Sequence, residues 1–171
     1  MLHPVHGSFT GLRIGISTVK AFSDVTNIPI IGISSLESLA YNIKQDGLIA
    51  CMIDAKNDNV YFALYNLENK TYTLKEDLSA SNINDIITLL KKYKDNYITF
   101  VGDGSVVHKD TISQNFEKAK FATGEQNVQS SISIALAAFD KFQEGFIQNS
   151  NTLSPLYLRK SQAERALEGE K

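Results

Sequence analysis

The sequence predicts a mixed α/β domain with an antiparallel hairpin inside it. Segments with helical periodicity alternate with short apolar runs along the chain. The runs 48–53, 60–65 and 71–78 follow one another with turn-like residues between them, which is typical of an antiparallel meander. With 171 residues, 43% of them hydrophobic, the chain can build one domain of ordinary size or two small lobes.

The first predicted element is a helix from about Ser8 to Val25. Ser8 suits an N-cap, and apolar residues recur after it at helical spacing. Gly11 and Gly15 lie four residues apart on one face, and each interior glycine costs about 1 kcal/mol relative to alanine. We interpret this segment as a contact helix whose partner packs closely against its backbone. The simpler alternative is a weak helix.

The next elements are short. Pro29 ends the first helix, because proline disfavours helical geometry in the residue before it. The run 30–33 is predicted as a buried strand, and Ser34 with Glu37 fits a capping box that begins a second helix. The run 48–53 is apolar throughout, which indicates a central strand covered on both faces.

The remaining pattern continues the alternation of helices and strands. Apolar periodicity and turn residues predict a helix from Ser81, a strand at 97–101, a short helix at 110–116, a strand at 118–122 and a long helix at 130–146.

Composition limits the classes of function. The net charge of −2 offers no global basic field for nucleic acid, so any RNA role has to be local or depend on a partner. The one cysteine, Cys51, lies inside an apolar run, which predicts a buried thiol and favours a reducing compartment. No apolar stretch approaches the roughly 18 residues of a membrane span, so we expect a cytoplasmic protein without a membrane partner.

Two carboxylates are the candidates for chemistry. Asp54 and Asp103 each follow directly on an apolar strand, where acids can bind Mg²⁺ or orient a water molecule. The run 102–104, Gly-Asp-Gly, could let a backbone approach a phosphate, but it lacks the lysine and hydroxyl residue of a P-loop. Acids at strand ends also commonly form turns, and we favour that structural interpretation. We predict no metal site.

Several motifs resemble one known family. The segment 7–15, Gly-Ser-Phe-Thr-Gly-Leu-Arg-Ile-Gly, closely resembles the signature of the TsaB (YeaZ) family. Segments 27–37, 53–61 and 154–159 are similar to further parts of the same family. The resemblance therefore spans nearly the whole chain.

The resemblance implies a fold and a role. It implies the actin-like ATPase fold with two RNase-H-like lobes. It also implies a non-catalytic, cytoplasmic accessory protein for making threonylcarbamoyladenosine (t6A) at position 37 of tRNA. The implied partners are a TsaD homologue, which performs the transfer, and a TsaE homologue, an ATPase. The resemblance also implies that the complex uses ATP while this chain itself requires no cofactor. The chain is then expected to contact tRNA only as part of the complex.

The chain also departs from the family pattern. Family members carry a strand hairpin and a helix ahead of the motif at 7–15. We therefore expect a truncated first lobe at 1–46 with its contact helix at 8–25, a complete second lobe at 47–146, and an extended segment and tail at 147–171. Loss of neighbouring strands would bare apolar side chains, so we also predict a homodimer through the contact helix.

The predicted partner interface lies on the contact helix. It comprises eight residues: Phe9, Gly11, Leu12, Arg13, Gly15, Ile16, Thr18 and Lys20. The alternative is an enzyme, either an M22-type glycoprotease-like hydrolase or a small ATPase, in which Asp54 and Asp103 converge on a metal or phosphate. A third reading is an RNase-H-like binding module without a TsaD partner.

Overall fold

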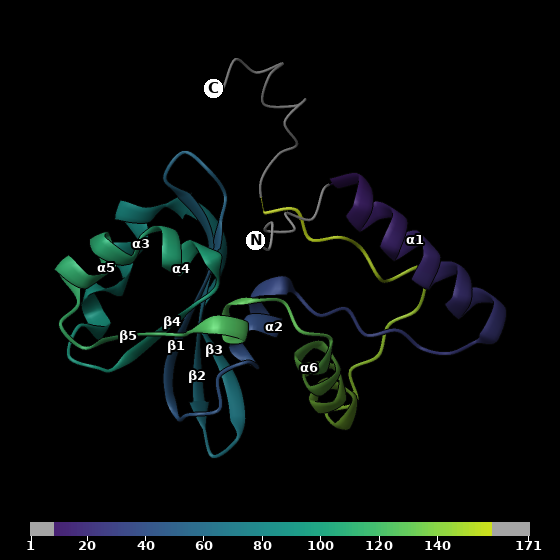
Figure 1. Cartoon of the computed structure of the whole chain (residues 1–171). Coiled ribbons are helices and arrows are strands. Elements are labelled where there is room, and N and C mark those ends of the chain that lie inside the picture. The colour runs from purple at the N-terminus through teal and green to yellow at the C-terminus, as the bar shows by residue number, and fades with distance from the viewer. Residues whose placement is uncertain (1–8, 159–171) are drawn as a thin grey trace. The chain divides into compact units, whose positions relative to one another are not determined.

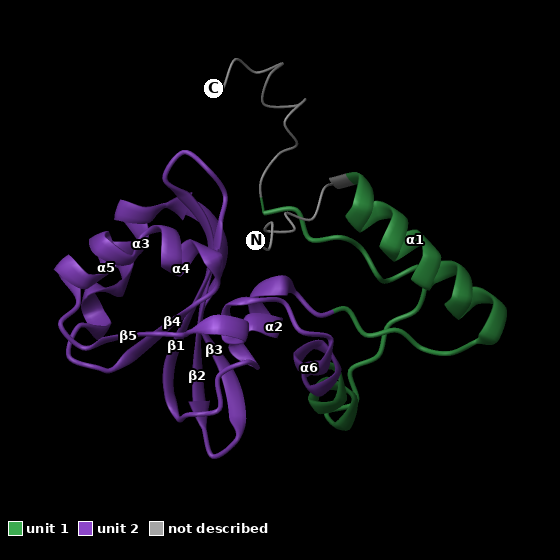
Figure 2. Ribbon diagram, viewed as in Figure 1, with its two compact units in different colours: residues 1–32, 138–171 green, residues 33–137 purple. Residues whose placement is uncertain are grey.

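The computed structural model describes residues 9–158, and the chain separates into two compact units. Residues 33–137 form one unit, and residues 1–32 with 138–171 form the other (Figure 2). Helix α2 (Ser35–Ala40) belongs to the first of these because it packs on the sheet. The assignment of segments 1–46, 47–146 and 147–171 to lobes stays a prediction.

The unit 33–137 is built on a five-stranded mixed sheet. Strands β1 (Gly47–Asp54), β2 (Asn59–Glu68) and β3 (Thr71–Asn82) form the predicted antiparallel meander. Strand β4 (Ile98–Val101) lies parallel to β1, and β5 (Ala119–Phe121) lies parallel to β4. The strand order is β3-β2-β1-β4-β5 (Figure 1), which confirms the mixed α/β fold.

The turns of the meander follow from their residues. Asn69 and Lys70 both have positive φ, at 51° and 68°, which joins β2 to β3 through a two-residue hairpin loop with the twist of the strands. The β1–β2 turn holds Lys56, Asn57 and Asp58 with positive φ as well. Asparagine and aspartate tolerate this region better than most residues.

Both faces of the sheet are covered, as the uniform apolar run of β1 predicts. One face packs against α3 (Ile83–Leu90) and α5 (Lys109–Asn115). This core contains Met52, Phe62, Leu64, Ile86, Leu90, Phe100, Ile112 and Phe116. The alternate residues of β1, Ile49 and Cys51, are fully buried on the other face, where α2 contacts β1 and β2.

Helices α2 and α3 begin where polar side chains cap them. The Glu37 amide donates to Ser34 Oγ at 3.0 Å, which confirms Ser34 as the cap of α2. The helix predicted to start at Ser81 and Asn82 is α3, whose first residue is Ile83 because β3 extends to Asn82. Asn82 caps α3, and a short 3₁₀ turn, η1 (Lys91–Tyr93), follows it.

Helix α4 (Asp103–Val107) was not predicted, and it explains the Gly-Asp-Gly run. Gly102 has φ 100°, and a Cβ built there would lie 2.2 Å from the Met52 carbonyl oxygen. A Cβ at Gly104 would lie 3.0 Å from the carbonyl carbons of Met52 and Ile53. Both glycines therefore let the β4–α4 connection pack directly on the backbone of β1.

The second unit contains helix α1 (Phe9–Thr26) and a bridge between distant segments. The predicted strand at 30–33 was wrong: Ile30 forms an isolated antiparallel bridge with Gln148 instead. The two residues exchange backbone hydrogen bonds of 2.8 and 2.7 Å. The Gly32 amide also donates to the Gln148 side chain at 2.9 Å, which ties the two segments together.

Helix α6 (Ser131–Gln143) runs across the boundary of the two units and follows the 3₁₀ turn η2 (Gly124–Asn127). It is shorter than the predicted helix at 130–146. Helical periodicity predicts Ile134, Ala137, Ala138 and Phe142 on its apolar face. Ala137 is buried and Ala138 is half-buried, but Ile134 and Phe142 are exposed, and Ser133 is buried as well. The buried side of α6 is therefore made of small residues, so the predicted face was right for Ala137 and wrong for Ile134 and Phe142.

Candidate functional site

Helix α1 carries exposed apolar side chains along most of its length. Phe22 is 68% exposed and Val25 is 83% exposed. The inner side of the helix is marked by Ile16 and Lys20, which are half-buried, and by Ser23, which is buried. These three residues follow helical spacing and mark one side of α1, whereas most of its other described residues are exposed.

The structure divides the predicted interface residues between two sides of α1. The exposed residues are Gly11, Leu12, Arg13, Gly15 and Thr18. Ile16 and Lys20 lie on the half-buried side, and the Phe9 side chain lies outside the described part. The Thr18 hydroxyl donates to the Ile14 carbonyl of its own helix at 2.9 Å. Whether this set binds a partner stays a prediction.

Nothing in the described part of the chain requires a glycine at position 15. Beyond the backbone of its own helix, no described atom lies within 4 Å of the position that a Cβ would take there. The residue is exposed and its φ is not in the left-handed region. Neither local crowding nor backbone strain among residues 9–158 accounts for this glycine.

Arg13 connects two of the family-like motifs. Its Nε donates to the Tyr157 hydroxyl at 2.9 Å, and its guanidinium carbon lies 5.6 Å from the centroid of the Tyr157 ring. Arg13 of the first motif and Tyr157 of the last therefore meet in space. The sequence pattern does not pair these two residues, because nothing local links positions 144 apart.

A hollow of about 320 Å³ lies beside the C-terminal half of α1. Apolar side chains form most of its wall, and the chain following the helix completes it. Its lining residues are Val19, Phe22, Ser23, Thr26, Ile28, Pro29, Ile30 and Ile31. This hollow adds apolar surface to the exposed side of α1.

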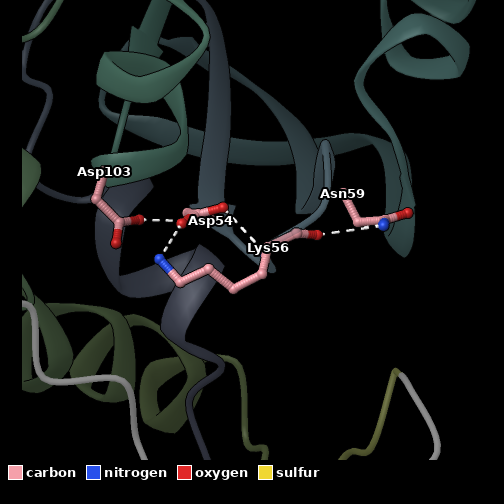
Figure 3. Close-up of polar contacts among 4 residues, drawn as sticks. All are labelled: Asp54, Lys56, Asn59 and Asp103. Carbon is pink, nitrogen blue, oxygen red and sulfur yellow. Dashed lines mark hydrogen bonds and ion pairs between the residues drawn. The ribbon is translucent and has the colours of Figure 1, made fainter. Parts of the chain in front are cut away.

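The two predicted carboxylates lie next to one another at the ends of β1 and β4 (Figure 3). Asp103 Oδ1 accepts the backbone N–H of Asp54 at 3.0 Å. Asp54 in turn accepts the backbone N–H of Lys56 at 2.9 Å and the Lys56 ammonium at 2.6 Å. The hydrogen bond and charge of Asp54 raise the pKa of Lys56. Asn59 Nδ2 donates to the Lys56 carbonyl at 3.2 Å.

These contacts are those of a strand-end turn. Asp54 closes a turn through the amide two residues ahead, which is a common use of aspartate. Among residues 9–158, no group of three His, Cys, Asp or Glu side chains could hold a metal ion. Lys56, which the sequence analysis missed, is signalled by its place two residues after Asp54. The observed contacts thus support the structural interpretation of both acids.

The thiol of Cys51 lies in the core, as its apolar surroundings in the sequence predict. Cys51 is fully buried in β1, and burial raises its pKa well above the ordinary value. A buried thiol with a raised pKa is a poor nucleophile, so Cys51 offers no chemistry. Across the described residues, none of the helices combines the length and the hydrophobicity needed to cross a bilayer.

Known families and relatives give a consistent comparison. Residues 7–167 match the family model described as TsaD: tRNA N6-adenosine threonylcarbamoyltransferase. The chain is 34% identical over 163 residues to the tRNA threonylcarbamoyladenosine biosynthesis protein TsaB of Bacillus subtilis, covering 92% of this chain and 68% of that protein. It is 26% identical over 167 residues to the Escherichia coli protein of the same name, covering 95% of this chain and 71% of that protein.

Solved structures agree on the fold. A Pseudomonas aeruginosa protein described as similar to peptidase YEAZ superposes with a TM-score of 0.69 at 20% identity, over 89% of this chain and 69% of that one. A structure described as YeaZ from the same organism gives a TM-score of 0.67 at 18% identity, over 88% and 70% of the two chains.

Proposed function

The chain belongs to the TsaB (YeaZ) family with its actin-like α/β fold, and from this membership we propose that it is a non-catalytic partner subunit in t6A formation on tRNA. In this role it binds and positions a TsaD homologue, which carries out the threonylcarbamoyl transfer. A TsaE homologue supplies ATPase activity to the assembly, so ATP is used by the complex and this chain requires no cofactor. The assembly works in the cytoplasm and brings tRNA to the chain.

The observation that carries the docking proposal is Gly15 on the exposed side of α1. A glycine in mid-helix costs about 1 kcal/mol relative to alanine, and no described neighbour explains it. A partner backbone that packs against this position would explain it. Neighbouring apolar side chains then contribute roughly 1.5–3 kcal/mol each when they are buried. The same surface accounts for a homodimer when the partner is absent.

An enzymatic role receives less support. The alternative of a glycoprotease-like hydrolase or a small ATPase needs Asp54 and Asp103 to act on a metal or phosphate. Their described contacts close a turn and hold β1 against α4 instead. We therefore do not extend the proposal to catalysis.

Reconstitution tests the proposed function. The chain is mixed with TsaD and TsaE homologues of its own organism, unmodified tRNA, threonine, bicarbonate and ATP, together with the enzyme that makes the threonylcarbamoyl donor. Formation of t6A is then measured by mass spectrometry of the digested tRNA. We expect t6A only when the chain is present. Equal t6A formation without the chain would contradict the proposal.

A further inference from the structure

The edge of the sheet at β5 carries two exposed lysines, Lys118 and Lys120. Lys120 lies on β5 and Lys118 directly precedes it, whereas the whole chain has 17 basic and 19 acidic residues. Strand β5 is the last strand in the sheet order (Figure 1), so this edge has no further strand among the described residues. Two cationic side chains therefore stand together at this edge on a chain that is acidic overall.

Strand register places an aromatic ring and two of these lysines on one face. Ile98 and Phe100 point into the core, so their neighbours Tyr97 and Thr99 lie on the opposite face. Thr99 pairs with Lys120 in the parallel register of β4 and β5. Residues paired in this way share a face, which places Lys120 beside Tyr97.

Side-chain positions confirm this arrangement. The Lys120 ammonium lies 4.7 Å from the centroid of the Tyr97 ring, and the Lys118 ammonium lies 5.6 Å from it. Lys118 also donates to the Asp95 carbonyl at 2.8 Å, which holds its side chain near the ring. Tyr97 is 62% exposed, and both lysines are exposed. We call Tyr97, Thr99, Lys118 and Lys120 the Tyr97 face.

Two lysines beside an exposed tyrosine suit a single-stranded nucleic acid, which offers both phosphates and unpaired bases. Lysine ammonium groups neutralise phosphates, and an exposed aromatic ring stacks on an unpaired base. An acidic protein surface would pair with the lysines but would leave the ring unused. The two lysines flank the ring from the neighbouring strand, so a base on the ring would keep its own phosphates within reach of them.

We propose that the Tyr97 face is an RNA-contact surface, by which the chain holds an unpaired stretch of tRNA inside the assembly. The choice of tRNA rests on the proposed function. Tyr97 stacks a base, and Lys118 and Lys120 bind phosphates. The net charge of the whole chain gives no sign of this surface, because it depends on only two lysines and one ring.

Binding of a fluorescent tRNA anticodon stem-loop to the chain tests this proposal. The measurement is anisotropy over a series of salt concentrations, starting at about 50 mM, where phosphate contacts are strong. In the double variant Lys118→Gln with Lys120→Gln, we expect weaker binding and a salt slope reduced by about 1.4, since each phosphate on a single strand contributes about 0.7. Tyr97→Leu should weaken binding about tenfold.

A matched control removes two charges elsewhere. Lys75 on β3 and Lys91 on η1 are exposed, and η1 lies next to β3 through the contact of Lys92 with Glu76. The double variant Lys75→Gln with Lys91→Gln should keep the RNA affinity and the salt slope. An equal loss in both double variants would show that only net charge matters, and it would overturn the proposal.

Other outcomes also decide the question. Failure of the unaltered chain to bind the stem-loop at low salt would overturn it. So would competition by heparin as strong as by RNA, combined with no effect of Tyr97→Leu. Reconstituted t6A formation separates this result from the proposed function: the Lys118, Lys120 variant should raise KM for tRNA. If the unaltered chain supports t6A formation and the variant has the same KM, the proposed function stands and the RNA surface is wrong.

Discussion

Replacing Gly102 by alanine should destabilise the sheet unit strongly. A Cβ at this position would lie 2.2 Å from the Met52 carbonyl oxygen, whereas carbon and oxygen atoms in contact normally stay about 3.3–3.6 Å apart. The obstacle is the backbone of β1, the central strand, which cannot rotate away as a side chain would. Gly102 also has φ 100° and ψ 167°, a conformation that is essentially reserved for glycine.

The cost has two parts. Backbone strain of this kind costs of order 1–3 kcal/mol, and forcing extra atoms into a packed core costs about 1–3 kcal/mol more. Gly102→Ala should therefore lower the free energy of unfolding by about 2–6 kcal/mol. At about 4–8 °C per kcal/mol for a unit of roughly 100 residues, Tm of the sheet unit should fall by at least about 8 °C.

Gly124→Ala is the matched control. Gly124 also has positive φ, at 55°, but nothing lies within 4 Å of its Cβ position. Its replacement should cost only the left-handed conformation, about 1 kcal/mol. Urea unfolding followed by circular dichroism gives both values. Equal losses for the two variants would refute the close approach to β1. Unchanged stability of Gly102→Ala would mean that packing does not require this glycine, and close approach of a phosphate would again be a candidate reason for it.

Three further predictions concern charge, turn structure and assembly. The hydrogen bond from Lys92 is the main cause that lowers the pKa of Glu76 below its ordinary 4.5, so this contact stabilises the fold above that pH and is lost as pH falls through the lowered value. Glu76→Gln should therefore reduce the acid-dependent part of the stability in urea titrations between neutral pH and pH 3, and an unchanged pH profile would contradict this. Asp103→Asn keeps an acceptor for the Asp54 amide and should cost less than 1 kcal/mol, whereas Asp103→Ala should cost about 1–3 kcal/mol; equal losses would argue against the hydrogen bond. Phe22→Glu should leave Tm within about 1 °C, since substitutions at exposed positions rarely change the stability of the fold. In light scattering, it should convert a homodimer into a monomer. If the unaltered chain is already monomeric, the dimer prediction is wrong.

Local signals made the sheet predictable. The apolar run of β1, the turn residues at 57–59 and the hairpin at Asn69 and Lys70 each depend on neighbours in sequence. The Ile30 bridge was mispredicted as a strand because its partner, Gln148, lies more than a hundred residues away. Helix α4 was missed because five residues are too few for helical periodicity to show.

The candidate site was predictable in part. Sequence identified α1 and its two glycines, and it placed Asp54 and Asp103 each at the end of an apolar strand. That these strands are neighbours follows only from the order of the folded sheet. It could not say which side of α1 faces inward, because apolar residues occur around the whole helix. The residue of α1 that is buried is the polar Ser23. The Tyr97 face escaped notice because its parts come from two strands whose register only the folded sheet provides.

The most direct test of the account is the affinity of the chain for the TsaD homologue of its own organism. Calorimetry would compare the unaltered chain with Gly15→Leu, and with Gln114→Leu as a control that adds the same side chain to an exposed position of α5. We expect tight binding by the unaltered chain and by Gln114→Leu, and a loss of at least about tenfold for Gly15→Leu with the circular dichroism spectrum unchanged. Equal affinity for Gly15→Leu would show that α1 is not the docking helix, and no binding by the unaltered chain would contradict the partner-subunit role itself.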